Sequence, residues 1–173
     1  MKKTGARAKW VRPENVHITL RFLGEIPEEK AREVCDSLRD GLENESEFTL
    51  KIAGLGAFPN ARRPNVVWLG IESADGRLGR LKKAVDKAIL PCGFEPETRA
   101  YTPHLTVGRT KSRKGAELLT RLLEDESGFE LGSMEAAEVH LVKSTLTPSG
   151  PIYDTMERFV LGSGQTVSER ELE

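Results

Sequence analysis

The feature that most constrains this chain is a four-residue motif, His-x-Thr-x, that occurs twice, as His17-Ile18-Thr19-Leu20 and as His104-Leu105-Thr106-Val107. The two copies hold two of the three histidines in the sequence and lie roughly half the chain apart. Each stands in a stretch of alternating apolar and polar residues, over 16–22 and 102–108, which predicts a half-buried β-strand. Side chains alternate between the faces of a strand, so the His and Thr of each copy share one face. The repeat therefore predicts two similar lobes that face each other across a cleft.

The same alternation predicts which apolar side chains of the two motif segments point into a core, and these are Ile18, Leu20, Phe22, Leu105 and Val107. Elsewhere the apolar spacing predicts helices over 27–44, 73–90 and 115–125. Strands are predicted over 48–58, 65–71, 137–146 and 152–161. This order lacks the regular alternation of a parallel sheet, so we expect antiparallel or mixed sheets with helices outside, followed by a polar tail over 162–173.

Charge and cysteine content place limits on the compartment and the partners. The net charge of −1 gives the molecule no overall field that attracts nucleic acid, although residues 1–13 and 98–116 carry basic side chains and no acidic ones. Cys35 and Cys92 follow no metal-ligand spacing and are expected to be ordinary thiols in a reducing cytoplasm. No apolar run is long enough to cross a bilayer, so we expect a cytoplasmic protein without membrane contact.

Two imidazoles on opposite walls of a cleft can act as general acid and general base, because histidine titrates near neutral pH. A threonine two residues later on the same face offers a hydroxyl donor to a bound oxyanion, an arrangement that suits a phosphodiester. Metal ligation is the competing interpretation, but zinc needs three or four protein ligands and neither motif has a neighbouring Cys, Asp or second His at ligand spacing. The third histidine, His140, has no Thr two residues later and is interpreted as a satisfied polar residue of a strand.

The residues around the motifs extend the pattern. Residues 10–25, which read Trp-Val-Arg-Pro-Glu-Asn-Val-His-Ile-Thr-Leu-Arg-Phe-Leu-Gly-Glu, and residues 102–109 closely resemble the two signatures of the two-histidine (2H) phosphoesterases. The likeness is to the RNA 2′,3′-cyclic phosphodiesterases, also called 2′-5′ RNA ligases. It extends to the segments 56–59, 62–70, 141–146 and 150–153, so that it covers about residues 9 to 161.

This resemblance implies a single two-lobed α+β domain over residues 1–161, in which pseudo-symmetric antiparallel sheets line a central groove with helices outside. It implies a reaction without cofactor or metal, in which a terminal 2′,3′-cyclic phosphate of RNA or an oligonucleotide is opened to a 2′-phosphate. His17 would be the proton donor to the leaving oxygen and His104 the proton acceptor that activates water, while Thr19 and Thr106 hold phosphate oxygens. Weak 2′-5′ ligation in the reverse direction is also implied.

Arg109 is a further candidate substrate-binding residue, at the start of a basic run with Lys111, Arg113 and Lys114 that could follow an RNA backbone. Because Arg109 lies three positions after Thr106, regular alternation would turn it to the opposite face unless Gly108 marks a β-bulge.

The family pattern also begins with a strand and a helix ahead of the Trp-Val-Arg-Pro segment, and these are expected to be missing here. The first lobe would then have an unpaired sheet edge that favours a homodimer. Two alternatives to the phosphodiesterase stay open on the sequence alone. One is a noncatalytic module that binds RNA ends. The other is a related hydrolase of cyclic nucleotides or 2′-5′ oligonucleotides.

Overall fold

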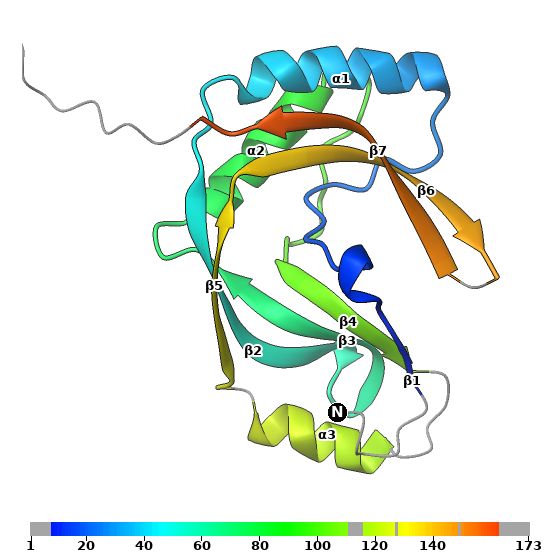
Figure 1. Ribbon diagram of the computed structural model, residues 1–173, viewed down its shortest axis with the longest axis vertical. Helices are drawn as coiled ribbons and strands as arrows, with labels where there is room; N and C mark the ends of the chain where they lie inside the picture. Colours follow the sequence, from blue (N-terminus) through cyan, green and yellow to red (C-terminus); the bar gives the residue numbers. More distant parts are fainter. Residues whose placement is uncertain (1–7, 111–115, 127, 149, 163–173) are drawn as a thin grey trace, which may run out of the picture.

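The computed structural model describes residues 8–110, 116–126, 128–148 and 150–162 (Figure 1). It contains three α-helices, α1 (Glu28–Leu42), α2 (Arg77–Ile89) and α3 (Ala116–Asp125), and a short 3₁₀ turn, η2 (Pro13–Asn15). The seven strands are β1 (Ala8–Trp10), β2 (Phe48–Asn60), β3 (Arg63–Glu72), β4 (His104–Thr110), β5 (Glu130–Ala136), β6 (Glu138–Thr147) and β7 (Gly150–Val160). Within the described residues the fold is thus α+β, with antiparallel pairing between all named strands.

One lobe is a five-stranded sheet in the order β1-β4-β3-β2-β5, with α3 against β2 and β3. Leu119 and Leu123 of α3 pack on Ala57 and Val67 in a small apolar cluster. The two central strands, β2 and β3, form the hairpin that the sequence predicts, although each is longer than predicted and the turn between them is correspondingly short. This sheet carries the second histidine motif on β4.

The other lobe contains the two-stranded β6–β7 sheet together with α1 and α2, which lie at the opposite end of the molecule from α3 (Figure 1). Ala31, Val34, Leu38 and Leu42 recur at helical spacing along α1 and form its buried stripe. The larger core joins the two helices to Val139 and Phe159 of the β6–β7 sheet and to Leu50, Ile71 and Leu105 of the five-stranded sheet. The larger of the two apolar clusters therefore includes residues from both lobes.

The segment 16–22 is not the strand that the sequence predicts. Its backbone pairs with another strand only at the isolated antiparallel bridge between Ile18 and Leu105. Ile18, Leu20 and Leu23 do pack against the main core, but Phe22 is 78% exposed, and its predicted place in the core is wrong. Apolar alternation records which side chains are buried, whereas a strand also requires a ladder of backbone hydrogen bonds. Beyond the single bridge, no named strand pairs with this segment in the described part of the chain.

Other boundaries follow the sequence closely, with two omissions. The three predicted helices form, and Ser73 and Asp75 both accept backbone hydrogen bonds at the start of α2, from Leu78 and Arg77 respectively. The sequence does not predict strands β1 and β5, which form the two edges of the five-stranded sheet. The expected tail from residue 163 onward, and the basic side chains Lys111, Arg113 and Lys114, lie outside the described residues.

No helix among the described residues is both long and apolar enough to cross a membrane. Cys35 and Cys92 are free thiols, the first partly exposed and the second buried. Burial raises the pKa of the Cys35 thiol, which keeps it protonated at neutral pH.

A test of the helix packing uses Gly41, where α1 and α2 approach each other. A Cβ atom at Gly41 would lie 2.6 Å from the Cβ of Ala88, so Gly41→Ala must push the helices apart. We expect a loss of about 1–3 kcal/mol from overpacking, which exceeds the gain of at most about 1 kcal/mol in helix propensity. The matched control is Gly79→Ala in α2, where an added Cβ meets nothing within 4 Å and the propensity gain should remain. Urea unfolding should therefore show opposite signs for the two variants.

Candidate functional site

The two histidine motifs meet at the bridge between Ile18 and Leu105. Both of these side chains face the main core, so the residues on either side of them point to the opposite face. Because the bridge is antiparallel, its register places His17 level with Thr106 and Thr19 level with His104. The sequence-predicted His and Thr residues are thus brought together on one face, although one of the two segments is not a strand.

Extended backbone on both sides of the bridge would put the four side chains at the corners of a small parallelogram. Directly opposite residues in such a pair have Cβ atoms about 5 Å apart, and residues two apart on an extended segment are separated by about 7 Å. The two histidines would then occupy one diagonal and the two threonines the other. An anion the size of a phosphate, placed at the centre, would have an imidazole on each of two opposite sides and a hydroxyl on each of the other two. Within the described residues neither threonine hydroxyl has a hydrogen-bond partner, so both are available to a ligand.

Each histidine is oriented by the same local hydrogen bond. His17 Nδ1 lies 2.9 Å from the carbonyl oxygen of Asn15, and His104 Nδ1 lies 2.7 Å from that of Thr102, so both bonds span two residues. A carbonyl oxygen can only accept, which means that Nδ1 carries the hydrogen in both rings. Nε2 is then the free nitrogen of each ring, an acceptor when the ring is neutral and a donor when it is charged.

The aromatic surroundings of the two rings differ. His104 is half-buried on β4, with its ring 5.0 Å from the ring of Phe58 in an edge-to-face contact and 6.1 Å from that of Trp68. His17 is exposed, and its described ring contact is an edge-to-face contact with Tyr153 of β7, at 5.0 Å. In addition, Asn15 Nδ2 donates to the carbonyl of Pro151 at 3.3 Å, so the β6–β7 hairpin supports the turn that precedes His17.

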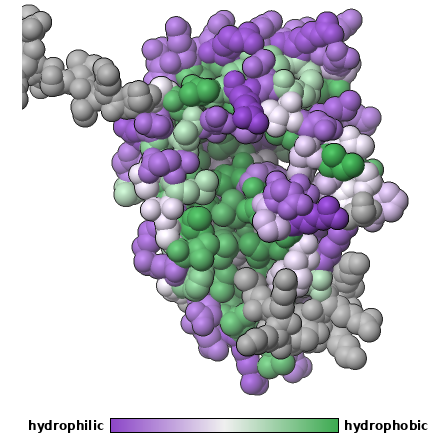
Figure 2. Space-filling view, viewed as in Figure 1, coloured by the Kyte–Doolittle hydropathy of each residue, from purple (hydrophilic) through white to green (hydrophobic). Residues whose placement is uncertain are grey.

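The absence of a side chain at Gly56 leaves space for the indole of Trp68. A Cβ atom on Gly56 would lie 2.2 Å from the Trp68 ring, so the indole covers the backbone of β2 at that glycine. Phe58 and Trp68 also contact each other, with ring centroids 5.3 Å apart. On the face shown in Figure 2, hydrophobic side chains gather in the middle of the molecule and below it, while hydrophilic side chains dominate the upper end.

Arg109 lies on the same face as Thr106 because β4 contains a bulge. Its register partners on β3 are Val66 for Arg109 and Trp68 for Thr106, and these two residues are two apart and share a face. The extra residue is Val107, next to Gly108, so the bulge lies beside the glycine that suggested it. On the other side Arg109 is opposite Lys9 of β1, which places two cationic side chains next to each other.

Sequence reasoning missed the residues that support the histidines, namely Asn15, Phe58, Trp68, Thr102 and Tyr153. The signal that could have found Trp68 is its pairing with Gly56 on the neighbouring strand, because a glycine opposite a large aromatic allows the ring to lie flat. Among the described residues no group of three or more His, Cys, Asp or Glu side chains is placed to hold a metal ion. Two cavities of the described structure do not include either motif: one of about 380 Å³ lies between α3 and Arg62, and one of about 450 Å³ lies beside Glu47 and Arg77.

Comparison with known proteins agrees with the two-histidine phosphoesterase class that this fold and site define. The family model for LigT-like phosphoesterases matches residues 2–68 and 69–153, and the chain belongs to this family. A protein of Methanothermobacter thermautotrophicus named RNA 2′,3′-cyclic phosphodiesterase is 43% identical over 93% of this chain and 86% of its own length. A protein of the same name from Aeropyrum pernix is 39% identical, over 88% of this chain and 86% of its own. The crystal structure of TT0787 of Thermus thermophilus has a TM-score of 0.73 at 26% identity, covering 91% of this chain and 84% of that one.

A test of the aromatic support for His104 uses Gly56→Ala. The added methyl would occupy the space of the Trp68 indole, so the ring must leave its place and the packing around His104 must change. We expect the tryptophan emission to shift and the Cε1–H resonance of His104 to move, with little change at His17, at a cost of about 1–3 kcal/mol in stability. Gly79→Ala is the matched control, since its added methyl touches nothing. An unchanged His104 resonance in a folded Gly56→Ala protein would contradict this view of the site.

Proposed function

We propose that this protein hydrolyses a terminal 2′,3′-cyclic phosphate on RNA or an oligonucleotide to a 2′-phosphate. The observation that carries the proposal is the Ile18–Leu105 bridge, since its register directs two histidines with the same Nδ1 hydrogen bond, and two threonines, to one face. The curated relatives from Methanothermobacter thermautotrophicus and Aeropyrum pernix, both named RNA 2′,3′-cyclic phosphodiesterase, support the choice of substrate.

In the proposed reaction, His104 is the base and His17 the acid. Neutral Nε2 of His104 takes a proton from water as the oxygen attacks phosphorus. The bond from phosphorus to O3′ breaks, and protonated Nε2 of His17 gives its proton to that oxygen. In-line displacement at phosphorus requires the attacking and leaving oxygens on opposite sides, and a diagonal pair of imidazoles meets that requirement. The two rings then return to their starting protonation states by exchange with solvent.

The remaining side chains of the face would bind the substrate. Thr19 and Thr106 would donate hydrogen bonds to the two non-bridging phosphate oxygens, whose negative charge the reaction increases. Arg109, brought to this face by the bulge, would contact the phosphate of the preceding nucleotide. The same groups could bind a 2′-phosphate product and support weak 2′-5′ ligation in reverse.

We further propose that residues 1–161 act as one catalytic domain in the cytoplasm. The apolar core that runs through both lobes supports a single domain, and the two unpaired cysteine thiols suit a reducing compartment.

The first prediction from this proposal concerns the two histidines. We expect His17→Ala and His104→Ala each to lower kcat about 10²- to 10⁴-fold while product binding persists, because each removes one proton-transfer step. The native enzyme should show a bell-shaped dependence of kcat on pH. His140→Ala is the control, since His140 lies on β6 in an exposed ion pair with Glu138. Near-native turnover in either motif variant would contradict the acid-base pairing, whereas a native protein without turnover would leave the noncatalytic RNA-end module.

The second prediction concerns metal. Because the proposed steps use only protein side chains, hydrolysis of a 2′,3′-cyclic nucleotide should proceed at the same rate in excess EDTA. A panel of cyclic phosphates on mononucleotides and oligonucleotides, assayed with and without chelator, would also identify the preferred substrate. Loss of activity in EDTA, with recovery on adding a divalent ion, would contradict the mechanism.

The third prediction concerns assembly. The sequence predicts a homodimer through an unpaired sheet edge of the first lobe, and we propose that the β6–β7 sheet supplies this edge. Among the described strands, β6 and β7 pair only with each other, so each has an outer edge without a strand partner. This sheet also exposes large apolar side chains, with Leu146 85%, Val160 73% and Ile152 52% exposed. Unpaired edges with exposed apolar residues favour association with a second copy.

Light scattering over a concentration series should therefore show a dimer that Leu146→Lys dissociates, because a charge on an edge strand opposes pairing. Leu118→Lys, on the exposed side of α3 in the other lobe, should leave the dimer intact. A monomer at every concentration, with a high melting temperature that does not depend on concentration, would refute the dimer.

A further inference from the structure

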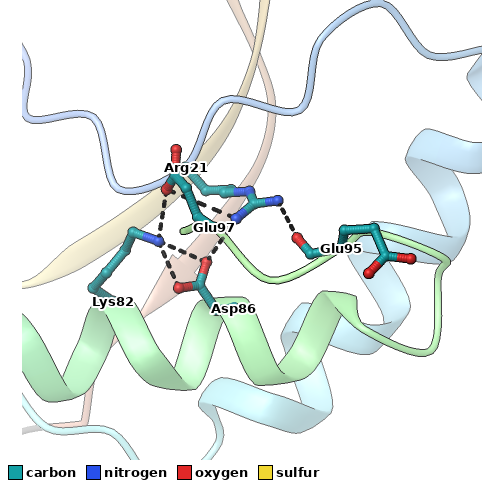
Figure 3. A network of polar contacts seen from close by, with 5 residues as sticks. All are labelled: Arg21, Lys82, Asp86, Glu95 and Glu97. Carbon is teal, nitrogen blue, oxygen red and sulfur yellow. Dashed lines mark hydrogen bonds and ion pairs between the residues drawn. The ribbon is translucent and has the colours of Figure 1, made fainter. Parts of the chain in front are cut away.

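A cluster of four charged side chains lies beside the segment that follows His17 (Figure 3). Lys82, in α2, is only 5% exposed. Its ammonium group lies 2.6 and 2.7 Å from the two carboxylate oxygens of Asp86 and 3.0 Å from the carboxylate of Glu97. The guanidinium of Arg21 enters the same cluster, 3.5 Å from Asp86 and 3.7 Å from Glu97, and donates to the carbonyl oxygen of Glu95 at 2.6 Å. Two cations and two carboxylates thus balance each other's charge.

The members of this charged cluster come from three parts of the chain that include both flanks of the site. Arg21 lies four residues after His17 and two after Thr19. Glu95 and Glu97 belong to the loop that leads through Tyr101 and Thr102 into β4 and His104. Asp86 and Lys82 belong to α2, whose apolar face is part of the main core. Arg21 therefore ties the end of the first motif to the chain just before the second, with α2 as the fixed support.

The first motif needs such a tie more than the second does. His104 lies on a strand with neighbours on both sides, β1 and β3. The segment 16–22, by contrast, has one isolated bridge and no ladder among the described strands. On its N-terminal side, Asn15 is held by the carbonyl of Pro151. On its C-terminal side, Arg21 makes the polar contacts with α2 and the 95–97 loop, and its side chain is only 12% exposed.

The chemistry of the charged cluster is better suited to holding chain segments in fixed positions than to increasing the stability of the fold. Ion pairs withdrawn from water contribute little net stability, because the attraction between the charges is largely offset by lost hydration. The planar, forked guanidinium of arginine instead holds several acceptors in fixed directions at once. Tyr101 lines the same cluster, with the Lys82 ammonium 5.7 Å from its ring centroid. Burial, followed by the negative charge of Glu97, raises the pKa of Tyr101 to about 12, so this neighbour stays uncharged at neutral pH.

We propose that Arg21 is a positioning residue: by binding Asp86, Glu97 and the Glu95 carbonyl, it sets the place of the His17 segment relative to His104. This inference rests on the proposed phosphodiesterase activity for its kinetic consequence, but not for its structural one. A shift of the His17 segment would misplace the acid and Thr19, whereas Thr106 and Arg109 on β4 would continue to bind phosphate. The loss should therefore fall on kcat and spare KM.

The test compares Arg21→Met, which keeps the length of the side chain and removes the fork, with Arg21→Lys, which keeps the charge. For a 2′,3′-cyclic nucleotide, Arg21→Met should lower kcat about 10- to 100-fold, the scale expected for a displacement of about 1 Å, and change KM less than about threefold. Arg21→Lys should recover part of the loss. Glu97→Gln should lower kcat as well, and the double variant should be no worse than Arg21→Met alone, because both substitutions remove the same tie.

Two controls separate positioning from general destabilisation. Arg39→Met on α1 removes two exposed ion pairs, one with Asp36 of α1 and one with Glu157 of β7, and should leave kcat unchanged. Leu123→Ala destabilises the small α3 cluster, and at a temperature where it is fully folded its kcat should also be unchanged. If Arg21→Met keeps kcat within about threefold of the wild type, or if Leu123→Ala loses as much, the proposal is overturned.

A second readout does not depend on turnover. The chain has three histidines, so the Cε1–H correlations of the folded protein give three resolved signals. Arg21→Met should shift or broaden the His17 signal and leave that of His140 in place. If the wild-type protein hydrolyses no cyclic phosphate, the proposed function fails while a moved His17 signal still supports the positioning role. An unmoved His17 signal in folded Arg21→Met overturns the positioning role whatever the activity.

Discussion

The antiparallel contact between Ile18 and Leu105 is the constraint on which the site depends. It is a single backbone bridge, but each of its two residues also buries an apolar side chain in the core that joins the lobes. Burial of both side chains determines which way the neighbouring residues must point. The hydrophobic packing beneath the histidines and threonines therefore determines which face of the two segments they occupy. A substitution that altered the packing of Leu105 would reach all four of these side chains at once.

Orientation of the imidazoles, unlike their placement, is a local property. In both motifs the ring is held by the carbonyl oxygen two residues earlier, so the hydrogen bond closes within a tripeptide. The sequences of the two tripeptides differ at the first two positions, Asn15-Val16 against Thr102-Pro103, which is possible because only the backbone takes part. The two motifs thus share a local hydrogen bond, whereas the sheets of the two lobes differ. Among the described strands one sheet has five strands and the other has two.

The sequence predicted those parts of the fold whose signal lies within a single segment. The three helices follow from apolar stripes at helical spacing, and the β2–β3 hairpin follows from two alternating runs around a turn. Strand β5 has no such signal, because nearly all of its residues are exposed and only pairing with β2 makes it a strand. The wrong prediction of a strand over 16–22 has the opposite cause. The alternation of apolar and polar residues is present there, but among the described strands none forms a ladder of backbone hydrogen bonds with this segment. In the same way, Phe58, Trp68 and Tyr153 reach the histidines through contacts between distant segments, which no local pattern reports.

The bulge at Val107 has a consequence for how β4 can vary. Between Thr106 and Arg109, β4 has one residue more than the stretch of β3 that it pairs with. The alternation of faces along β4 is therefore shifted by one residue at the bulge. If β4 kept its length but lost the bulge, regular alternation would send Arg109 to the face where α3 packs. Deletion of Val107 would instead leave Arg109 two positions after Thr106, so that a regular strand would keep both side chains on one face. Substitutions at Val107 leave the number of residues intact. The face on which Arg109 lies thus depends on how β4 pairs with β3, and not on the residue type that stands between Thr106 and Arg109.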